Sequence, residues 1–337
     1  MSAVYVCAPG RSGNIASSMS RRGYLDYLRE RGHLVVWTGS SSPDYVAGLG
    51  LDDTDVRTGS FRVWFGRAVV GAVSGPTRIA VDTGRVEVGV RHSMHMWMLA
   101  LLMVIALPRG GRGIWRGRGV DASSGNPVVL LPYRIVSALC RRSMDDGLPN
   151  WAFRLGTPTS RWGTDRPLAA LVLRGDRPRP SDEWMAWFTA TTSNLGLEPA
   201  VLVHSTDDYL SSQHLSRALG GQYRAWFVGN HADQEQTVRD VYARSAIVVG
   251  DRVHALVAGA TEGAVPLGWV ESGSVGTTFD AVGMPWVGRW EGDAVERFPA
   301  LDLALLAEYR GVMTEAVDRC RAVLGRVDPV EVGHDEY

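Results

Sequence analysis

The sequence contains no lysine, so all 35 of its basic residues are arginines. This absence excludes mechanisms that need a lysine amine: a Schiff base with a substrate carbonyl, lysine-bound pyridoxal phosphate and the phosphate-binding lysine of a P-loop. Anionic groups must therefore be bound by arginine, histidine or backbone N–H groups. Arginine suits this task because its planar guanidinium forms two parallel hydrogen bonds with a carboxylate or a phosphate.

Cysteine is also scarce, and its three copies, Cys7, Cys140 and Cys320, are far apart. Their odd number and wide spacing provide neither a disulfide framework nor the closely spaced ligands of a metal site. We therefore expect a cytoplasmic protein without a bound metal ion. The strand-like run Ala3–Ala8 begins almost at the first residue, so we also expect no signal peptide.

Neither sign of charge is in excess, because 35 basic and 36 acidic residues leave a formal net charge of -1. This balance argues against non-specific binding to nucleic acid and against strong attraction to anionic lipid. The apolar run Met94–Leu107 is shorter than the roughly 18 residues that a membrane-spanning helix needs, so no transmembrane segment is expected. We expect a buried core helix there, with peripheral membrane contact as the alternative.

The sequence does contain two successive runs of strand and helix patterns, which predict an α/β protein. The first run has a strand at Ala3–Ala8, a helix at Ile15–Arg31 and a strand at Leu34–Thr38. Val69–Val73 is rich in β-branched residues and is predicted as a further strand. A chain of 337 residues is long enough for two such domains.

The second run begins after a stretch without periodicity, residues 156–166, which is rich in Gly, Pro and Thr. We therefore divide the chain into domains 1–160 and 161–337. The predicted strands of the second domain include Leu168–Leu173, Pro199–His204 and Ala246–Val249. The amphipathic pattern of Leu301–Leu324 predicts one long C-terminal helix.

Arginine and histidine recur where the strands of the second domain end. These residues are Arg174, His204, His231 and the pair Arg252 and His254. In a parallel sheet, the carboxyl ends of the strands and the N-termini of the following helices form the usual crevice for ligands. We therefore expect these side chains to converge on one site for a small anion that carries a carboxylate and a phosphate.

The segment around Arg252 resembles the signature of the polysaccharide pyruvyl transferases. It reads Asp251-Arg-Val-His254-Ala, continues as a helix of small residues and ends in Gly263-Ala-Val-Pro266. Leu171-Val-Leu-Arg174 and Phe279-Asp-Ala-Val-Gly-Met-Pro285 also match. The resemblance implies two Rossmann-like domains facing a cleft, as in glycosyltransferase-B-like enzymes. It implies transfer of pyruvate from phosphoenolpyruvate onto a sugar of an exopolysaccharide or cell-wall glycan as a ketal.

The resemblance also implies roles for the residues at the strand ends. Arg252 and Arg174 would bind the phosphate and carboxylate of phosphoenolpyruvate, and His254 would act as a proton donor. His204 or His231 is the candidate for the second proton transfer, and His231 is also a candidate substrate ligand. No cofactor is implied beyond phosphoenolpyruvate as the donor substrate.

The first domain would bind the glycan acceptor, which can be free or lipid-linked. Gly13 and Asn14 fall where the family has a loop rich in Gly and Asn, and aromatic residues such as Trp115 could assist them. Ala16 and Ser17 replace the usual Gly-Asp of that loop. A lipid-linked acceptor would bring the protein to the inner face of a membrane, and the oligomeric state is not indicated.

Two alternatives remain open from the sequence. The first is a nucleotide-sugar-dependent glycosyltransferase of the same architecture, because Glu262-Gly263 resembles a loop that holds the donor ribose in some such enzymes. The second is a non-catalytic relative that binds glycan, which the altered first-domain loop keeps in consideration.

Overall fold

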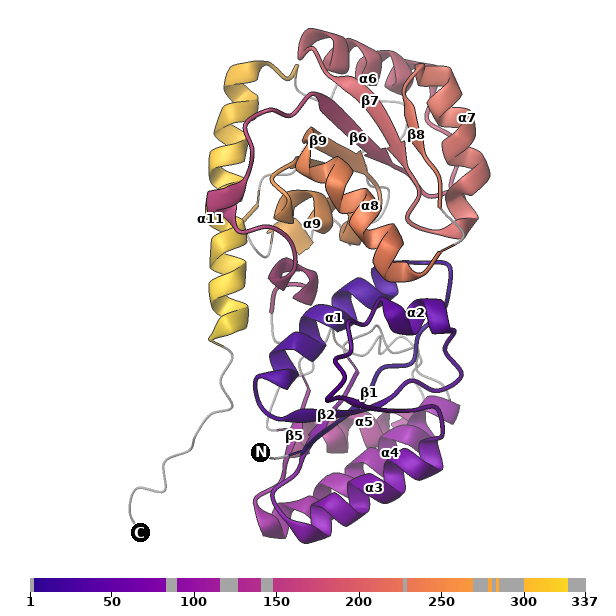
Figure 1. Ribbon diagram of the computed structural model, residues 1–337, viewed down its shortest axis with the longest axis vertical. Coiled ribbons are helices and arrows are strands. Elements are labelled where there is room, and N and C mark those ends of the chain that lie inside the picture. The colour runs from indigo at the N-terminus through magenta and orange to yellow at the C-terminus, as the bar shows by residue number, and fades with distance from the viewer. Residues whose placement is uncertain are drawn as a thin grey trace. The chain divides into compact units, whose positions relative to one another are not determined.

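The computed structural model contains two compact α/β units (Figure 1). The residues it describes are 3–82, 90–115, 127–140, 148–226, 229–268, 278–280, 283–284 and 300–326. The first unit comprises Met1–Leu148 and Trp226–Gln236, and the second comprises Pro149–Ala225 and Thr237–Tyr337. The two-domain α/β organisation predicted from the sequence is confirmed.

The sheet of the first unit has five parallel strands in the order β3-β2-β1-β4-β5. Its strands are β1 (Ala3–Cys7), β2 (His33–Trp37), β3 (Val56–Thr58), β4 (Arg78–Ala80) and β5 (Arg112–Ile114). Its helices are α1 (Ala16–Arg29), α2 (Pro43–Ala47), α3 (Phe61–Ser74), α4 (Val90–Ala106) and α5 (Pro127–Leu139), with a 3-10 turn at Leu107–Arg109. The chain starts on the central strand and extends first to one side and then to the other, as Rossmann-like sheets do.

The main core of the first unit lies between its sheet and helices α3, α4 and α5. Tyr5 of β1 contacts Trp64 of α3 edge to face, with 6.2 Å between the ring centroids. The same buried cluster includes Leu102 of α4 and Tyr133 of α5. Because side chains of a strand alternate between the two faces of a sheet, Tyr5 and Cys7 both face these three helices.

The sheet of the second unit has the order β10-β9-β6-β7-β8, and all its strands are parallel. Its strands are β6 (Leu168–Val172), β7 (Glu198–Leu202), β8 (Gln222–Arg224), β9 (Ser245–Gly250) and β10 (Val265–Gly268). Its helices are α6 (Asp182–Asn194), α7 (Tyr209–Leu219), α9 (Val253–Thr261), α11 (Leu303–Gly325) and the part of α8 (His231–Ala243) that begins at Thr237. The 3-10 turns of this unit are Trp151–Arg154, Thr159–Arg161 and Thr206–Asp208. Counted along the chain, the strand order repeats that of the first unit.

Helix α9 lies close against the sheet of the second unit because its residues are small. A Cβ atom at Gly259 would overlap the side chain of Val248 in β9, so glycine permits this approach. Residues Ala255 to Thr261 are all buried. The close packing holds the beginning of α9, with Arg252 and His254, at the carboxyl end of β9.

Two expectations about the chain's organisation are wrong. Residues Val69–Val73 belong to helix α3, which the Ser60 side chain caps by accepting a hydrogen bond from Val63 N at 3.4 Å. β-branched residues alone did not reveal the helical spacing of the buried residues Trp64, Ala68 and Ala72.

The second unit starts at Pro149 rather than at residue 161. The 3-10 turn Trp151–Arg154 packs against α9 and α11, so the residues before position 161 already belong to the second unit.

Helix α11 confirms the predicted long C-terminal helix, whereas helix α4 departs from the expected buried core helix. Leu99 and Leu102 of α4 are buried, but Trp97 and Leu101 are 44% and 54% exposed. The helix therefore has one face in the core and an apolar face open to solvent. None of the helices in the described part of the chain is long and apolar enough to cross a membrane.

Candidate functional site

The carboxyl edge of the second sheet gathers charged residues from three loops. Arg174 follows β6, Asp208 follows β7, and Asp251 and Arg252 follow β9. Strand β6 lies between β7 and β9, so the three loops meet at one place. This is the position where parallel α/β sheets bind ligands.

Asp208 joins two of these loops. Its Oδ1 accepts a hydrogen bond from Gly175 N at 2.8 Å and one from the Arg252 guanidinium at 2.5 Å. The Asp208 side chain is 1% exposed, and that of Arg252 is 17% exposed. Gly175 is needed because a Cβ atom there would lie 2.6 Å from the carbonyl oxygen of Asp207. The Asp208 carboxylate therefore holds the loop after β6 in place and also orients the Arg252 side chain.

Asp251 holds the same β6 loop from the other side. Its Oδ1 accepts a hydrogen bond from Arg174 N at 3.0 Å, and its Oδ2 lies 3.6 Å from Arg177 Nε. Burial raises the pKa of Asp251 to about 6, although Arg177, the hydrogen bond from Arg174 N, and Arg252 act in the opposite direction. Asp251 immediately precedes the N-cap position of α9. That position belongs to Arg252, which makes no capping hydrogen bond with its side chain.

Several buried polar atoms at this edge have no hydrogen-bond partner among the described residues. They are Asp208 Oδ2, Asp251 Oδ2 and Arg252 Nε. Most buried polar atoms in folded proteins are paired, so unpaired ones require an explanation such as ligand binding. The three atoms comprise two acceptors and one donor, and Arg252, which carries the donor, is the N-cap residue of α9 and makes no capping hydrogen bond with its side chain.

Arg174 and His254 complete the carboxyl-edge site. Arg174 forms an exposed ion pair with Asp176 at 2.5 Å, and this hydrogen bond lowers the pKa of Asp176 to about 2. His254 is half-buried in the first turn of α9. Of the predicted strand-end residues, Arg174, Arg252 and His254 are therefore the ones that lie at the same edge.

His204 does not belong to this accessible set. It is fully buried, and its Nε2 lies 2.6 Å from the hydroxyl of Tyr242. Burial, with the positive charge of Arg252 and His254, lowers its pKa to about 3. Full burial and the hydrogen bond with Tyr242 place His204 in the core, so its role in the second proton transfer stays a prediction.

His231 belongs to the first unit rather than to the strand ends of the second. Its Nδ1 lies 2.9 Å from Ser18 Oγ of α1, and its ring contacts Tyr45 edge to face. Burial lowers its pKa below the ordinary value for histidine. The sequence placed His231 after β8, but the residue begins α8 and packs in the core of the first unit. A convergence of His231 with Arg252 stays a prediction.

The loop after β1 contains the two predicted acceptor residues. Gly13 has a φ of 79°, a left-handed conformation that favours glycine. Asn14 Oδ1 accepts a hydrogen bond from Ala16 N at 3.0 Å, so its side chain helps to begin α1. Trp115, the aromatic residue expected to assist them, is buried in the core of the first unit instead. A role of Gly13 and Asn14 in glycan binding stays a prediction.

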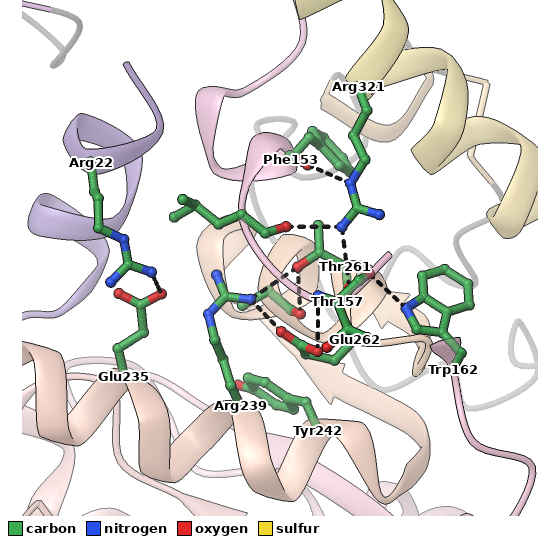
Figure 2. Close-up of polar contacts among 12 residues, drawn as sticks. Arg22, Phe153, Thr157, Trp162, Glu235, Arg239, Tyr242, Thr261, Glu262 and Arg321 are labelled. Carbon is green, nitrogen blue, oxygen red and sulfur yellow. Dashed lines mark hydrogen bonds and ion pairs between the residues drawn. The ribbon is translucent and has the colours of Figure 1, made fainter. Parts of the chain in front are cut away.

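Glu262, the residue behind the nucleotide-sugar alternative, lies at the opposite, amino edge of the second sheet. Its Oε1 lies 2.7 Å from Arg239 Nη1, and its Oε2 accepts a hydrogen bond from Thr157 N at 3.3 Å (Figure 2). The Arg239 and Glu262 side chains are 8% and 4% exposed. Helix α9 runs back from the carboxyl edge, so its last residues cannot reach the site there. The carboxylate of Glu262 is structural.

The sequence analysis missed Asp208 and Asp251 as site residues. Both directly follow predicted strands, in the same position as the basic residues that were selected. Acidic residues in such loops are often solvated, and only their burial shows that they organise the site. Among the described residues, no group of three or more His, Cys, Asp or Glu side chains is arranged to hold a metal ion.

No protein-family model and no curated protein matches this chain. Solved structures do match its fold. A UDP-N-acetylglucosamine 2-epimerase is 9% identical over 95% of this chain and 94% of that chain, with a TM-score of 0.54. S. aureus MnaA with UDP is 9% identical over 95% and 94%, with a TM-score of 0.48. E. coli ADP-heptose LPS heptosyltransferase II is 13% identical over 96% and 98%, with a TM-score of 0.45.

At these identities the likeness shows the fold alone. It confirms the glycosyltransferase-B-like class, with two Rossmann-like domains and a long C-terminal helix. Binding of the glycan acceptor by the first domain and of the donor by the second stays a prediction.

Proposed function

We propose that this chain is a glycan-modifying transferase whose phosphate-bearing donor binds at the carboxyl edge of the second sheet. The observation that carries the proposal is the set of unpaired buried atoms on Asp208, Asp251 and Arg252. A guanidinium beside the first N–H groups of a helix suits a phosphate, and carboxylate oxygens suit the hydroxyl groups of a sugar.

A nucleotide-activated sugar is the donor that the comparisons support best. The UDP-N-acetylglucosamine 2-epimerase with the same fold is named for a substrate of this class. In this scheme Arg252 binds the diphosphate, and Asp208 Oδ2 and Asp251 Oδ2 accept hydrogen bonds from sugar or ribose hydroxyls. Positively charged donors aimed at the diphosphate stabilise the charge that develops as the leaving group departs.

Phosphoenolpyruvate is a second candidate donor, and the Arg252-x-His254 pair at the start of α9 favours it. In this scheme two hydroxyls of one sugar add to the enolpyruvyl carbon, which becomes a ketal as inorganic phosphate leaves. His254 protonates the methylene carbon and recovers a proton from one hydroxyl group, and the proton of the other hydroxyl group leaves with the phosphate. Arg252 and Arg174 bind the phosphate and carboxylate. The carboxylates of Asp208 and Asp251 count against this donor, because they place negative charge close to its own carboxylate.

Thermal unfolding with candidate donors tests the proposal and separates the two donors. A ligand at about 100 times its Kd stabilises the folded state by about 2.7 kcal/mol. We expect UDP- or ADP-sugars, or else phosphoenolpyruvate, to raise the Tm of the wild type and to have no effect on Arg252→Ala. Arg217→Ala removes an exposed arginine of α7 and is the matched control. If neither donor class shifts the Tm of the wild type, the proposal is wrong.

A transfer assay decides whether the bound donor is consumed. Release of nucleoside diphosphate or of inorganic phosphate, in the presence of glycan acceptors, identifies the reaction. Donor binding without release would point to the non-catalytic alternative.

A further inference from the structure

Helices α3, α4 and α5 of the first unit carry large apolar side chains on their outer sides. On α4 these are Met94, Trp97, Leu101 and Val104, at the spacing of one helix face. Val70 of α3 and Val128 of α5 extend the same pattern on the neighbouring helices, and the six residues are between 44% and 73% exposed. Helix α4 contacts both α3 and α5, and these six exposed side chains are called here the outer apolar face.

The inner sides of the same helices already fill the core of the first unit. The outer apolar face is therefore not needed to hold the three helices on the sheet. Large exposed apolar surfaces are uncommon on soluble domains and mark sites of contact with a partner or a membrane.

The three helices that bear the outer apolar face carry charged side chains of one sign only. No Asp or Glu occurs in Phe61–Ser74, Val90–Ala106 or Pro127–Leu139, although the whole chain has 36 acidic residues. Exposed arginines lie on two of these helices, Arg62 and Arg67 on α3 and Arg134 on α5. The whole chain has a net charge of -1, but these helices are locally positive. The local charge attracts anionic groups that come within a Debye length of about 8–10 Å.

We propose that the outer apolar face binds the surface of an anionic lipid bilayer. Trp97, Leu101 and their neighbours enter the boundary between headgroups and acyl chains, and the arginines contact lipid phosphates. A second copy of the chain fits this surface less well. Two-fold contact places the same patch on both subunits and so brings arginine against arginine. The inference does not depend on the donor proposed above.

Co-sedimentation with vesicles tests the proposal on the full chain. The wild type is expected to sediment with vesicles that contain phosphatidylglycerol, and much less with phosphatidylcholine alone or at high salt. Leu101→Glu is expected to weaken binding about tenfold or more, because it removes apolar burial and adds a repelled charge. Arg62→Gln combined with Arg67→Gln is expected to weaken it roughly tenfold to thirtyfold.

Leu303→Glu is the matched control, since Leu303 is 70% exposed on α11 of the second unit. Circular dichroism confirms that each variant is folded. The proposal is overturned if the wild type stays in the supernatant with anionic vesicles, or if Leu101→Glu and Leu303→Glu bind equally well. It is also overturned if sedimentation velocity shows a wild-type dimer that Leu101→Glu dissociates, without vesicle binding. That result assigns the surface to a second copy.

Discussion

The two edges of the second sheet carry similar residues but use them differently. At the amino edge, Arg166 donates hydrogen bonds to the carbonyl groups of Tyr242, Ser245 and Glu262 at 3.3, 3.0 and 2.7 Å. Arg239 pairs with the Glu262 carboxylate beside them. At the carboxyl edge, Asp208 and Asp251 also form ion pairs, with Arg252 and Arg177, but their other hydrogen bonds come from loop N–H groups, those of Gly175 and Arg174.

This difference teaches how to separate a structural ionic cluster from a candidate site. The amino-edge arginines mostly bind backbone carbonyls, which ties together the starts of strands. Arg321 of α11 does the same for the 3-10 segment, donating to the carbonyls of Phe153 and Leu155 at 3.1 and 3.0 Å. The carboxyl-edge groups instead hold loops that follow β6, β7 and β9, at the edge where parallel sheets bind ligands. Burial and charge alone do not distinguish the edges.

The largest effect is expected from breaking the amino-edge pair. Glu262→Ala removes the carboxylate that neutralises the buried Arg239 guanidinium, and the hydrogen bond from Arg239 to Thr261 Oγ1 remains. Removing one member of a buried pair costs about 3–5 kcal/mol of unfolding free energy. Urea unfolding followed by circular dichroism measures this loss. Glu198→Ala changes an exposed glutamate and is expected to shift stability by no more than about 0.5 kcal/mol. Equal stability of the two variants would show that the pair is not structural.

At the carboxyl edge, a pH-dependent effect of roughly 3 kcal/mol is expected from Asp251. Burial raises its pKa from 3.8 to about 6, so between these values the folded state holds a proton that the unfolded state has lost. Its contribution to stability therefore falls as the pH rises from about 4 to 6. Asp251→Asn stays neutral and removes this loss.

Urea unfolding of wild type and Asp251→Asn at several pH values measures the effect. Between pH 4 and 7 the unfolding free energy of Asp251→Asn should rise relative to that of the wild type. The contributions of the other titrating groups are the same in both proteins and cancel in this difference. Two stability curves that run parallel across this range would contradict the prediction.

A smaller loss, about 1–2 kcal/mol, is expected for Asp208→Asn. The amide oxygen can still accept the hydrogen bond from Gly175 N, but the ion pair with Arg252 is lost. The same variant should weaken donor binding, because Arg252 is no longer oriented. Asp207→Asn is a neighbouring exposed control. A Tm and a donor-induced shift that are identical for the two variants would remove Asp208 from the site.

The smallest effect on stability is expected for Arg174→Ala, below about 1 kcal/mol. Its ion pair with Asp176 is exposed, at 38% and 60% for the two side chains, and such pairs contribute little. If Arg174 contacts the donor, this variant lowers the donor-induced Tm shift with almost no change in the Tm without ligand. A large loss of stability would instead make Arg174 a structural residue.

The helical and strand patterns were predictable wherever periodicity or β-branched runs were strong. The predicted strands Leu168–Leu173 and Ala246–Val249 are observed as β6 and β9, and the predicted helix Leu301–Leu324 as α11. The strand predicted at Val69–Val73 is wrong because its three β-branched residues lie within a helix whose buried residues are spaced four positions apart. The outer side of α4 was also not predictable, since an all-apolar helix does not show which of its sides is covered.

The sequence by itself determined the parallel α/β class, the small-residue helix that became α9 and the presence of Arg174, Arg252 and His254 at strand ends. These features depend on local periodicity and on the connection rules of parallel sheets. Only the tertiary structure decided which charged groups are paired. The contacts that do so join residues distant in sequence, 44 positions apart for Asp208 and Arg252 and 77 for Arg174 and Asp251. Pairing and burial across such distances depend on packing, which no local pattern contains.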